Sequence, residues 1–297
     1  MKPDFKVKFM KLSLGFSPCP NDTFIFDALI HHKIDTEGLT FEVEYHDVET
    51  LNHKAFNREL AITKLSYHAF AYAVEDYELL DAGSALGFGV GPLLITKRTE
   101  LAEQLAAFAG KPLPEQFHQL KVGIPGKYTT ANFLLGLAYP SLQNKEIMVF
   151  SDIESALLDE RIDLGLIIHE NRFTYQDKGL FKVVDLGDYW EKTTESPIPL
   201  GGIAIRRDMP EEIKNKVNKL IRKSVEYAFA NPKSGLEYIR AHAQEMDEEV
   251  MYKHIDLYVN QYSVDLGPLG KKAIQSMFER AYTLNIVPKT SKNIFLK

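Results

Sequence analysis

Three short stretches of the sequence place small polar and charged side chains where an apolar strand pattern gives way to a helix pattern. They are SPCPNDTF (residues 17–24), TKLSY (residues 63–67) and PGKYTTAN (residues 125–132). The first turn of a helix has unpaired backbone N–H groups and a partial positive charge, so such side chains either cap it or help it bind an anion. Capping alone explains a single junction better. Three junctions together favour a ligand-binding cleft.

A histidine follows the apolar stretch LGLII, which ends at Ile168. His169 and Glu170 stand directly after this predicted buried strand. A lone histidine more often serves structure than catalysis, but one at the end of a strand that faces a polar cleft is placed for acid–base work near neutral pH. His169 is therefore the candidate general base. The other eight histidines, with His254 on a C-terminal helix among them, carry no comparable signal.

Other kinds of site are not expected. His169 and Glu170 are not continued into a His-Glu-x-x-His motif, and no cysteine and histidine group has zinc spacing, so we expect no metal. Cys19 has no evident base partner in the sequence, which argues against a nucleophile but allows a thiol in the cleft lining. Gly126-Lys127 lacks the spacing of a phosphate-binding loop, so we expect no ATP site.

The elements that would position these residues alternate between strands and helices over the first two-thirds of the chain. Strand patterns cover 12–16, 39–46, 60–64, 91–97, 120–124, 146–150 and 164–168, and helix patterns cover 22–32, 49–57, 66–77, 129–139 and 153–159. This alternation predicts an α/β fold with mainly parallel sheets. Ligands of such folds bind beyond the carboxyl ends of the strands, where all three junctions and His169 would lie.

The last third of the chain reads as helical from Pro210 onward, with Asn231 as the predicted N-cap of a second helix in this region. Gly-rich approaches at 84–97 and 193–208 bracket the central strand–helix segment. We therefore predict a discontinuous first α/β lobe, residues 1–97 and 201–297 with the C-terminal helices, and an inserted second α/β lobe, residues 98–200.

Composition limits the classes of function. The 297 residues are 45% hydrophobic and 26% charged, with a net charge of −6, as in a soluble globular protein of about two domains. The acidic balance argues against a nucleic-acid partner, and no apolar run is long enough for membrane insertion. One cysteine excludes an intrachain disulfide. The lysine-rich first ten residues lack the apolar segment of a secretory signal, which predicts a cytoplasmic protein with a leading extension outside the fold.

Six motifs in order resemble those of the 1,4-dihydroxy-6-naphthoate synthase family, which acts in the futalosine pathway of menaquinone biosynthesis. They are SPCPNDTFIFDAL, DVETLN, TKLSY, GVGPL, PGKYTTANFLL and LIIHENRFTY, and the resemblance extends from Leu12 to the C-terminus. It implies a fold like the type II periplasmic binding proteins, with two lobes and a ligand cleft between them. It also implies a lyase that converts cyclic dehypoxanthine futalosine to 1,4-dihydroxy-6-naphthoate.

The resemblance also implies residue roles. His169 corresponds to the proton acceptor of the family, and the matching substrate-binding residues are Lys64, Leu65, Ser66, Thr129 and Thr130. To these the junction argument adds Asn21 and Asp22 as one wall of the cleft. The expected partner is a small-molecule substrate, with no organic cofactor. The oligomeric state stays open, a homodimer included.

Two alternatives remain at this point. A solute-binding protein of a transporter has the same fold and would hold a small anionic ligand without a catalytic base. The sister enzyme that dehydrates chorismate at the start of the same pathway is the second alternative. The motifs around Ser17 and His169 favour the naphthoate synthase, and this preference rests on the resemblance.

Overall fold

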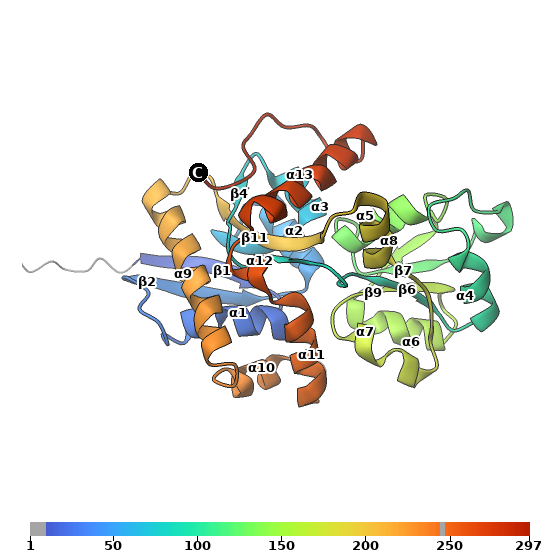
Figure 1. Ribbon diagram of the computed structural model, residues 1–297, viewed down its shortest axis with the longest axis horizontal. Helices are drawn as coiled ribbons and strands as arrows, with labels where there is room; N and C mark the ends of the chain where they lie inside the picture. The colour runs from blue at the N-terminus through green and yellow to red at the C-terminus, as the bar shows by residue number, and fades with distance from the viewer. Residues whose placement is uncertain (1–9, 244–246) are drawn as a thin grey trace, which may run out of the picture.

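The computed structural model describes residues 10–243 and 247–297, which form two α/β lobes, each built on its own β-sheet (Figure 1). The first sheet has the strand order β2-β1-β3-β11-β4, with β5 also paired to β11. Its strands are β1 (Met10–Phe16), β2 (Leu39–Tyr45), β3 (Ile62–Ser66), β4 (Tyr77–Leu79), β5 (Ala85–Gly87) and β11 (Ile198–Arg206). The predicted leading extension, residues 1–9, lies outside the described residues.

The second sheet has the order β10-β6-β9-β7-β8. Its strands are β6 (Leu93–Thr96), β7 (Val122–Ile124), β8 (Lys145–Ile147), β9 (Leu164–Ile167) and β10 (Phe181–Asp185). Both sheets are mixed: β1 is parallel to β2 and β3, and β7 to β8 and β9, whereas β11 runs antiparallel to β3, β4 and β5, and β6 antiparallel to β9 and β10. The two-lobe α/β class is confirmed, but the sheets are less parallel than predicted.

Helices cover the faces of both sheets (Figure 1). The first lobe carries α1 (Pro20–Ile30), α2 (Val48–Phe56), α3 (Tyr67–Ala73), α9 (Glu211–Ala230), α10 (Leu236–His242), α11 (Glu248–Tyr258), α12 (Gln261–Val264) and α13 (Gly267–Thr283). The second lobe carries α4 (Thr99–Ala106), α5 (Thr130–Ala138), α6 (Ile153–Leu158), α7 (Asn171–Thr174) and α8 (Leu186–Thr194), with 3₁₀ turns at Glu115–Phe117, Phe150–Asp152 and Gln176–Lys178.

The core of the first lobe is formed by apolar residues that recur with the two-residue period of a strand in β1 and with the helical period in α9. In β1 every second residue, Leu12, Leu14 and Phe16, points into one buried cluster, as the period of a strand requires. Helix α9 joins the same cluster through an apolar stripe that includes Val217, Ile221 and Val225, all fully buried. Burying one such side chain contributes roughly 1.5–3 kcal/mol, so this packing fixes β1 and the polar junction that follows it.

The chain passes between the sheets in two places. It leaves β5 of the first sheet and enters β6 of the second across residues 88–92, and it returns before β11 across residues 195–197. In the first passage a Cβ on Gly91 (φ +143°) would lie 2.8 Å from Gly187, so glycine allows the two segments to touch. The lobe boundaries 97/98 and 200/201 stay a prediction.

One helix start in the C-terminal region was predicted wrongly. Asn231 does not begin a helix: its backbone N–H bonds to the carbonyls of Tyr227 and Ala228, so it closes α9. Helix α10 begins only at Leu236. The Asn-Pro pair is equally compatible with the end of a helix, because proline after a C-cap cannot continue it. Asp247, by contrast, does cap a helix, since its side chain accepts from the backbone N–H of Val250 at the start of α11.

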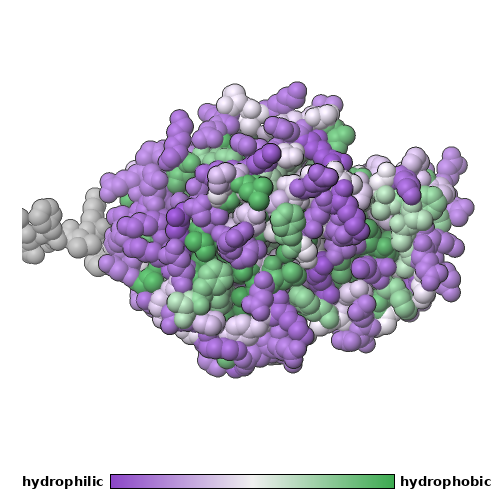
Figure 2. Space-filling model, in the orientation of Figure 1, coloured by the Kyte–Doolittle hydropathy of each residue, from purple (hydrophilic) through white to green (hydrophobic). Residues whose placement is uncertain are grey.

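Hydrophilic side chains cover most of the face shown in Figure 2, with apolar residues in small groups between them. Within residues 10–243 and 247–297, none of the helices combines the length and the apolar character that crossing a bilayer requires.

His68 links the lobes and makes stability depend on pH. It lies on α3, its ring stacks on Phe133 of α5, and its backbone N–H donates to the Thr130 hydroxyl. Burial lowers the pKa of His68 to about 4, so the folded protein holds it neutral where the unfolded chain, with a pKa near 6.5, binds a proton. The free energy of unfolding therefore falls as the pH drops from about 6.5 towards 4.

Urea denaturation across this pH range tests the effect. The change His68→Phe keeps the stacking and should reduce the loss of stability by up to about 1.4 kcal/mol per pH unit. The exposed His32, replaced by asparagine, serves as the control and should leave the pH dependence as it is. Equal slopes for wild type and His68→Phe would show that His68 does not titrate in this way.

Candidate functional site

A cavity of about 100 Å³ lies between the two lobes. Its walls come from the β1–α1 junction, the end of β3, the first passage between the sheets, the N-terminus of α5, the end of β9 and α11. All eight residues predicted from the sequence as site residues line it: Asn21, Asp22, Lys64, Leu65, Ser66, Thr129, Thr130 and His169. The structure therefore brings the three polar junctions and the candidate base to one place, and their roles in binding and catalysis stay predictions.

A buried ion pair forms the wall from the first lobe. The Lys64 ammonium donates to Asp22 Oδ1 at 2.8 Å and to the Gly83 carbonyl at 3.3 Å. Asp22 also accepts from the backbone N–H of Ser17 and from the side-chain amide of Asn21. The charge of Lys64 is thus offset within the protein, and its role towards a ligand is that of a hydrogen-bond donor more than of a free cation.

The opposite wall begins at the N-terminus of α5. Thr129 caps this helix, accepting from the backbone N–H of Asn132 and donating to the Gly126 carbonyl. The hydroxyl of Thr130 donates to the Leu200 carbonyl. The backbone N–H groups of Thr130 and Ala131 have no acceptor among the residues that the structure describes. These N–H groups, at the positive end of the helix dipole, are suited to bind an anionic group in the cavity.

His169 follows β9 in a conformation that few side chains adopt. Its φ of +61° lies in the left-handed region, which costs a residue with a Cβ roughly 1–2 kcal/mol. The ring packs edge-on against Phe150, and its buried Nε2 has no partner among the described residues. Burial lowers the pKa of His169, while the carboxylates of Glu170 and Asp22 raise it to a smaller extent. The imidazole is therefore neutral near pH 7 and able to accept a proton.

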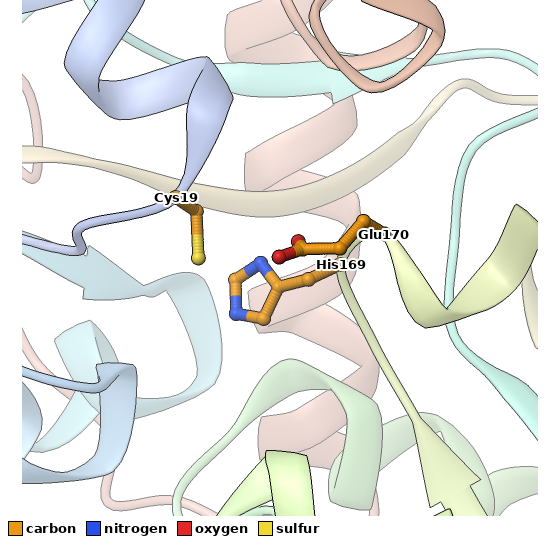
Figure 3. A group of neighbouring side chains, drawn as sticks. All are labelled: Cys19, His169 and Glu170. Carbon is orange, nitrogen blue, oxygen red and sulfur yellow. The ribbon is translucent and has the colours of Figure 1, made fainter. Parts of the chain in front are cut away.

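Cys19, His169 and Glu170 form the one group, within the described ranges, whose ligand atoms lie close enough together for a metal ion. Their sulfur, nitrogen and oxygen atoms lie within 4.8 Å of one another, and Figure 3 shows the three side chains converging from two segments. Burial and the nearby Glu170 raise the pKa of the Cys19 thiol, and the Ser17 hydroxyl donates to its sulfur. A protonated thiol is a poor ligand and a poor nucleophile.

The sequence did not single out two residues that line the cavity from α11. His254 is 1% exposed, and its Nε2 lies 2.9 Å from the Asn21 side-chain oxygen; Tyr258 packs on the same ring at 4.6 Å. Both belong to the apolar face of an amphipathic helix, where burial in the core is the usual explanation. No pattern within α11 indicates that this face meets the β1–α1 junction, more than 220 residues earlier in the chain.

Comparison with known proteins gives consistent results. The menaquinone biosynthesis family matches residues 12–283. The 1,4-dihydroxy-6-naphthoate synthase of Thermus thermophilus is 41% identical over 285 residues, covering 96% of this chain and 99% of that protein. The enzyme of the same name from Streptomyces coelicolor is 38% identical over 282 residues, covering 93% and 95%. The chain belongs to the menaquinone biosynthesis family.

Solved structures agree with this membership in the menaquinone biosynthesis family. A crystal structure of a protein from Archaeoglobus fulgidus superposes with a TM-score of 0.81 at 34% identity, covering 93% of this chain and 98% of that one. A Candida albicans protein described as having the generic periplasmic binding protein fold superposes with a TM-score of 0.69 at 13% identity, covering 97% and 98%. The latter likeness shows the fold alone. The periplasmic-binding-protein-like fold predicted from the sequence is confirmed.

The buried ion pair of this site has a measurable consequence for stability. Lys64→Met leaves the Asp22 carboxylate buried without its cation, which should lower the free energy of unfolding by about 3–5 kcal/mol in urea denaturation. The double variant Lys64→Met/Asp22→Asn removes the stranded charge and should recover part of the loss. A double variant less stable than Lys64→Met would contradict the pairing.

Proposed function

We propose that this protein is a 1,4-dihydroxy-6-naphthoate synthase, a lyase that converts cyclic dehypoxanthine futalosine to 1,4-dihydroxy-6-naphthoate with His169 as general base. Membership in the menaquinone biosynthesis family and two synthases at 41% and 38% identity over nearly the whole chain support the reaction. The observation that carries the mechanism is the position of His169 in the wall of a cavity between two lobes. Its imidazole is neutral, and its buried Nε2 has no partner among residues 10–243 and 247–297.

The reaction divides into proton removal, ring opening and aromatisation, with no net change of oxidation state. His169 takes a proton from carbon, and the resulting negative charge is spread into the substrate as an enolate. Donors placed in a cavity away from water stabilise such charge more strongly than donors in solution. Ring opening with loss of the sugar-derived fragment follows, and the aromatic product makes the later steps downhill. The protein needs to supply a base, donors and exclusion of water.

The polar lining supplies the binding contacts in this proposal. The carboxylate that remains in the naphthoate binds at the N-terminus of α5, where Thr130 and Ala131 line the cavity beside the capping Thr129. Lys64 and Ser66 donate to oxygens at the first-lobe side. Leu65 packs on the ring system, and Asn21 and Asp22 hold Lys64 in place. Because both lobes bury these groups, the substrate enters an open form and the lobes close on it.

The two alternatives from the sequence analysis, a solute-binding protein and a chorismate dehydratase, differ from the synthase in what happens to the ligand. A solute-binding protein would bind its ligand and release it intact, and the likeness to such proteins, at 12% identity, concerns the fold alone. A chorismate dehydratase would act on chorismate and not on the futalosine derivative. Cytoplasmic location and a homodimer, the remaining predictions, are measured by cell fractionation and light scattering.

Incubation of the purified protein with cyclic dehypoxanthine futalosine tests the proposed reaction, with the naphthoate followed by mass and ultraviolet absorbance. His169→Asn keeps a side chain that tolerates the left-handed backbone but removes the basic nitrogen. Its turnover should fall by a factor of about 10² to 10⁴, with substrate binding retained. In the wild type the rate should fall as the pH drops below the pKa of His169. Near-normal turnover by His169→Asn would assign the base to another residue.

Ser66→Ala tests the binding wall of the first lobe. Loss of one hydrogen bond costs on the order of 1 kcal/mol for a neutral partner and about 1.5–3 for a charged one, so substrate affinity should weaken several-fold or more. Calorimetric titration with the inactive His169→Asn background measures this affinity without turnover. Ser155→Ala, an exposed position on α6, is the matched control. Equal affinities in the two variants would remove Ser66 from the binding site.

A further inference from the structure

Behind His169 lies a carboxylate without a partner. Glu170 is 3% exposed, and neither of its carboxylate oxygens has a hydrogen-bond partner among the residues that the structure describes. It does not line the cavity. Its polar neighbours are a ring nitrogen of His169 and the Cys19 sulfur, both within 4.8 Å, and Nδ1 of His254, 3.9 Å from Oε2. A buried carboxylate with no donor is costly, so this one requires a proton or a cation beside it.

The protonation of His254 follows from the residues beyond it. The Asn21 side-chain amide donates from Nδ2 to the Asp22 carboxylate, which leaves its oxygen towards His254 Nε2 at 2.9 Å. An amide oxygen only accepts, so His254 Nε2 carries the proton. A neutral His254 then presents the lone pair of Nδ1 to Glu170 Oε2. Two acceptors would face each other inside the protein, unless one proton lies between them.

We propose that Glu170 is the positioning residue of His169 in the substrate complex. There, tightening of the lobes brings Glu170 Oε2 and His254 Nδ1, 3.9 Å apart in this structure, close enough to share one proton. The remaining oxygen of Glu170 then accepts from His169 Nδ1–H, which leaves Nε2 as the basic atom. Figure 3 shows the Glu170 carboxylate on the Nδ1 side of the His169 ring. No proton enters or leaves in this arrangement: the shared proton is held by the pair, and Nε2 alone exchanges one with the substrate. The catalytic part of this inference rests on the proposed function.

The two partners come from different lobes. Glu170 and His169 follow β9 in the second lobe, whereas His254 lies on α11 and Asn21 on α1 in the first. Their contact is therefore made when the lobes close. An open form leaves Glu170 without His254, and its charge is then free to bind water or a cation. Closure over the substrate fixes the tautomer of His169 at the moment when the base is needed, as a histidine–carboxylate pair does in other acid–base sites.

Several other titratable groups lie near these side chains and affect the pH dependence of the rate. Burial lowers the pKa of His254 well below its usual value, and burial lowers the pKa of His169 while Glu170 raises it. The charged and titratable groups that face His169, Glu170 and His254 from the packed elements are Cys19 and Asp22 of the first junction, Asp47 at the start of α2, Lys64 of β3 and Tyr258 of α11. Glu170 is the carboxylate with the largest effect on the pKa of His169.

The variant Glu170→Gln removes the carboxylate of residue 170 but keeps a side chain of the same size and shape. Glutamine can accept from His169 Nδ1 and donate to His254 Nδ1, so the fold and KM should be retained. Turnover should fall about tenfold or more, and the low-pH limb of the kcat/KM profile should move to lower pH by about one unit or more, because an amide oxygen stabilises the protonated ring of His169 less than the carboxylate oxygen it replaces. Glu170→Ala should lose more turnover than Glu170→Gln.

The matched control is Glu154→Gln. Glu154 is a carboxyl of the same lobe, 4% exposed, that pairs with Lys178 and Asn171 away from the cavity. This change should lower stability without moving the pH profile. A Glu170→Gln enzyme whose pH profile matches that of the wild type would overturn the positioning role, as would a Glu154→Gln enzyme with the same shift.

A readout without substrate keeps this inference separate from the proposed reaction. In ¹⁵N spectra of the histidine-labelled protein, the His169 signals, identified by their loss in His169→Asn, should show a protonated Nδ1 and an unprotonated Nε2 at pH 7. In Glu170→Ala the ring should become a mixture of tautomers. Unaltered signals in Glu170→Ala would overturn the inference. If the wild type shows the expected spectra but forms no naphthoate, the proposed reaction is overturned and the Glu170 arrangement is retained.

Discussion

The carboxylate of Asp22 holds the first wall of the cavity together. It accepts hydrogen bonds from Lys64 on β3, from the backbone of Ser17 and from the side chain of Asn21, and so joins the β1–α1 junction to the neighbouring strand. All these groups are buried, and in such surroundings charge–charge interactions are stronger than in water. The orientation of Asn21, and through it the proton on His254, depends on this one acceptor. The first lobe thereby presents a fixed set of donors to the second.

The second lobe contributes the proposed base, His169. His169 is held at the end of a fully buried strand in a left-handed conformation, and an αL residue placed there turns the chain away from the sheet direction and into α7. Strain of this kind persists only where the surroundings enforce it, and it occurs often at functional sites. The second lobe thus contributes two parts of the cavity wall. They are His169 and the N-terminus of α5, whose first N–H groups have no acceptor within the described part of the chain.

Sequence reasoning reached the parts of this site that depend on local pattern. Thr129 and Asp22 stand at helix starts because small polar residues follow an apolar strand, and this signal is visible within ten residues. His254 and Tyr258 were missed because their place in the cavity wall depends on which element α11 packs against, and an amphipathic stripe specifies burial without specifying the partner. The short strands β4 and β5 and the antiparallel β11 were missed or shortened for the same reason, since their pairing is set by distant strands. Asn231 shows the limit of capping signals, which are shared by helix starts and ends.

A crystal structure with 1,4-dihydroxy-6-naphthoate bound tests most directly whether the reacting ring lies between the lobes, against His169. We expect the product in the interlobe cavity, with a ring atom or hydroxyl within hydrogen-bond distance of His169 Nε2 and the carboxylate at the N-terminus of α5. Product bound outside the cavity, or inside it with His169 Nε2 turned away and paired to the protein, would contradict the proposed role of His169.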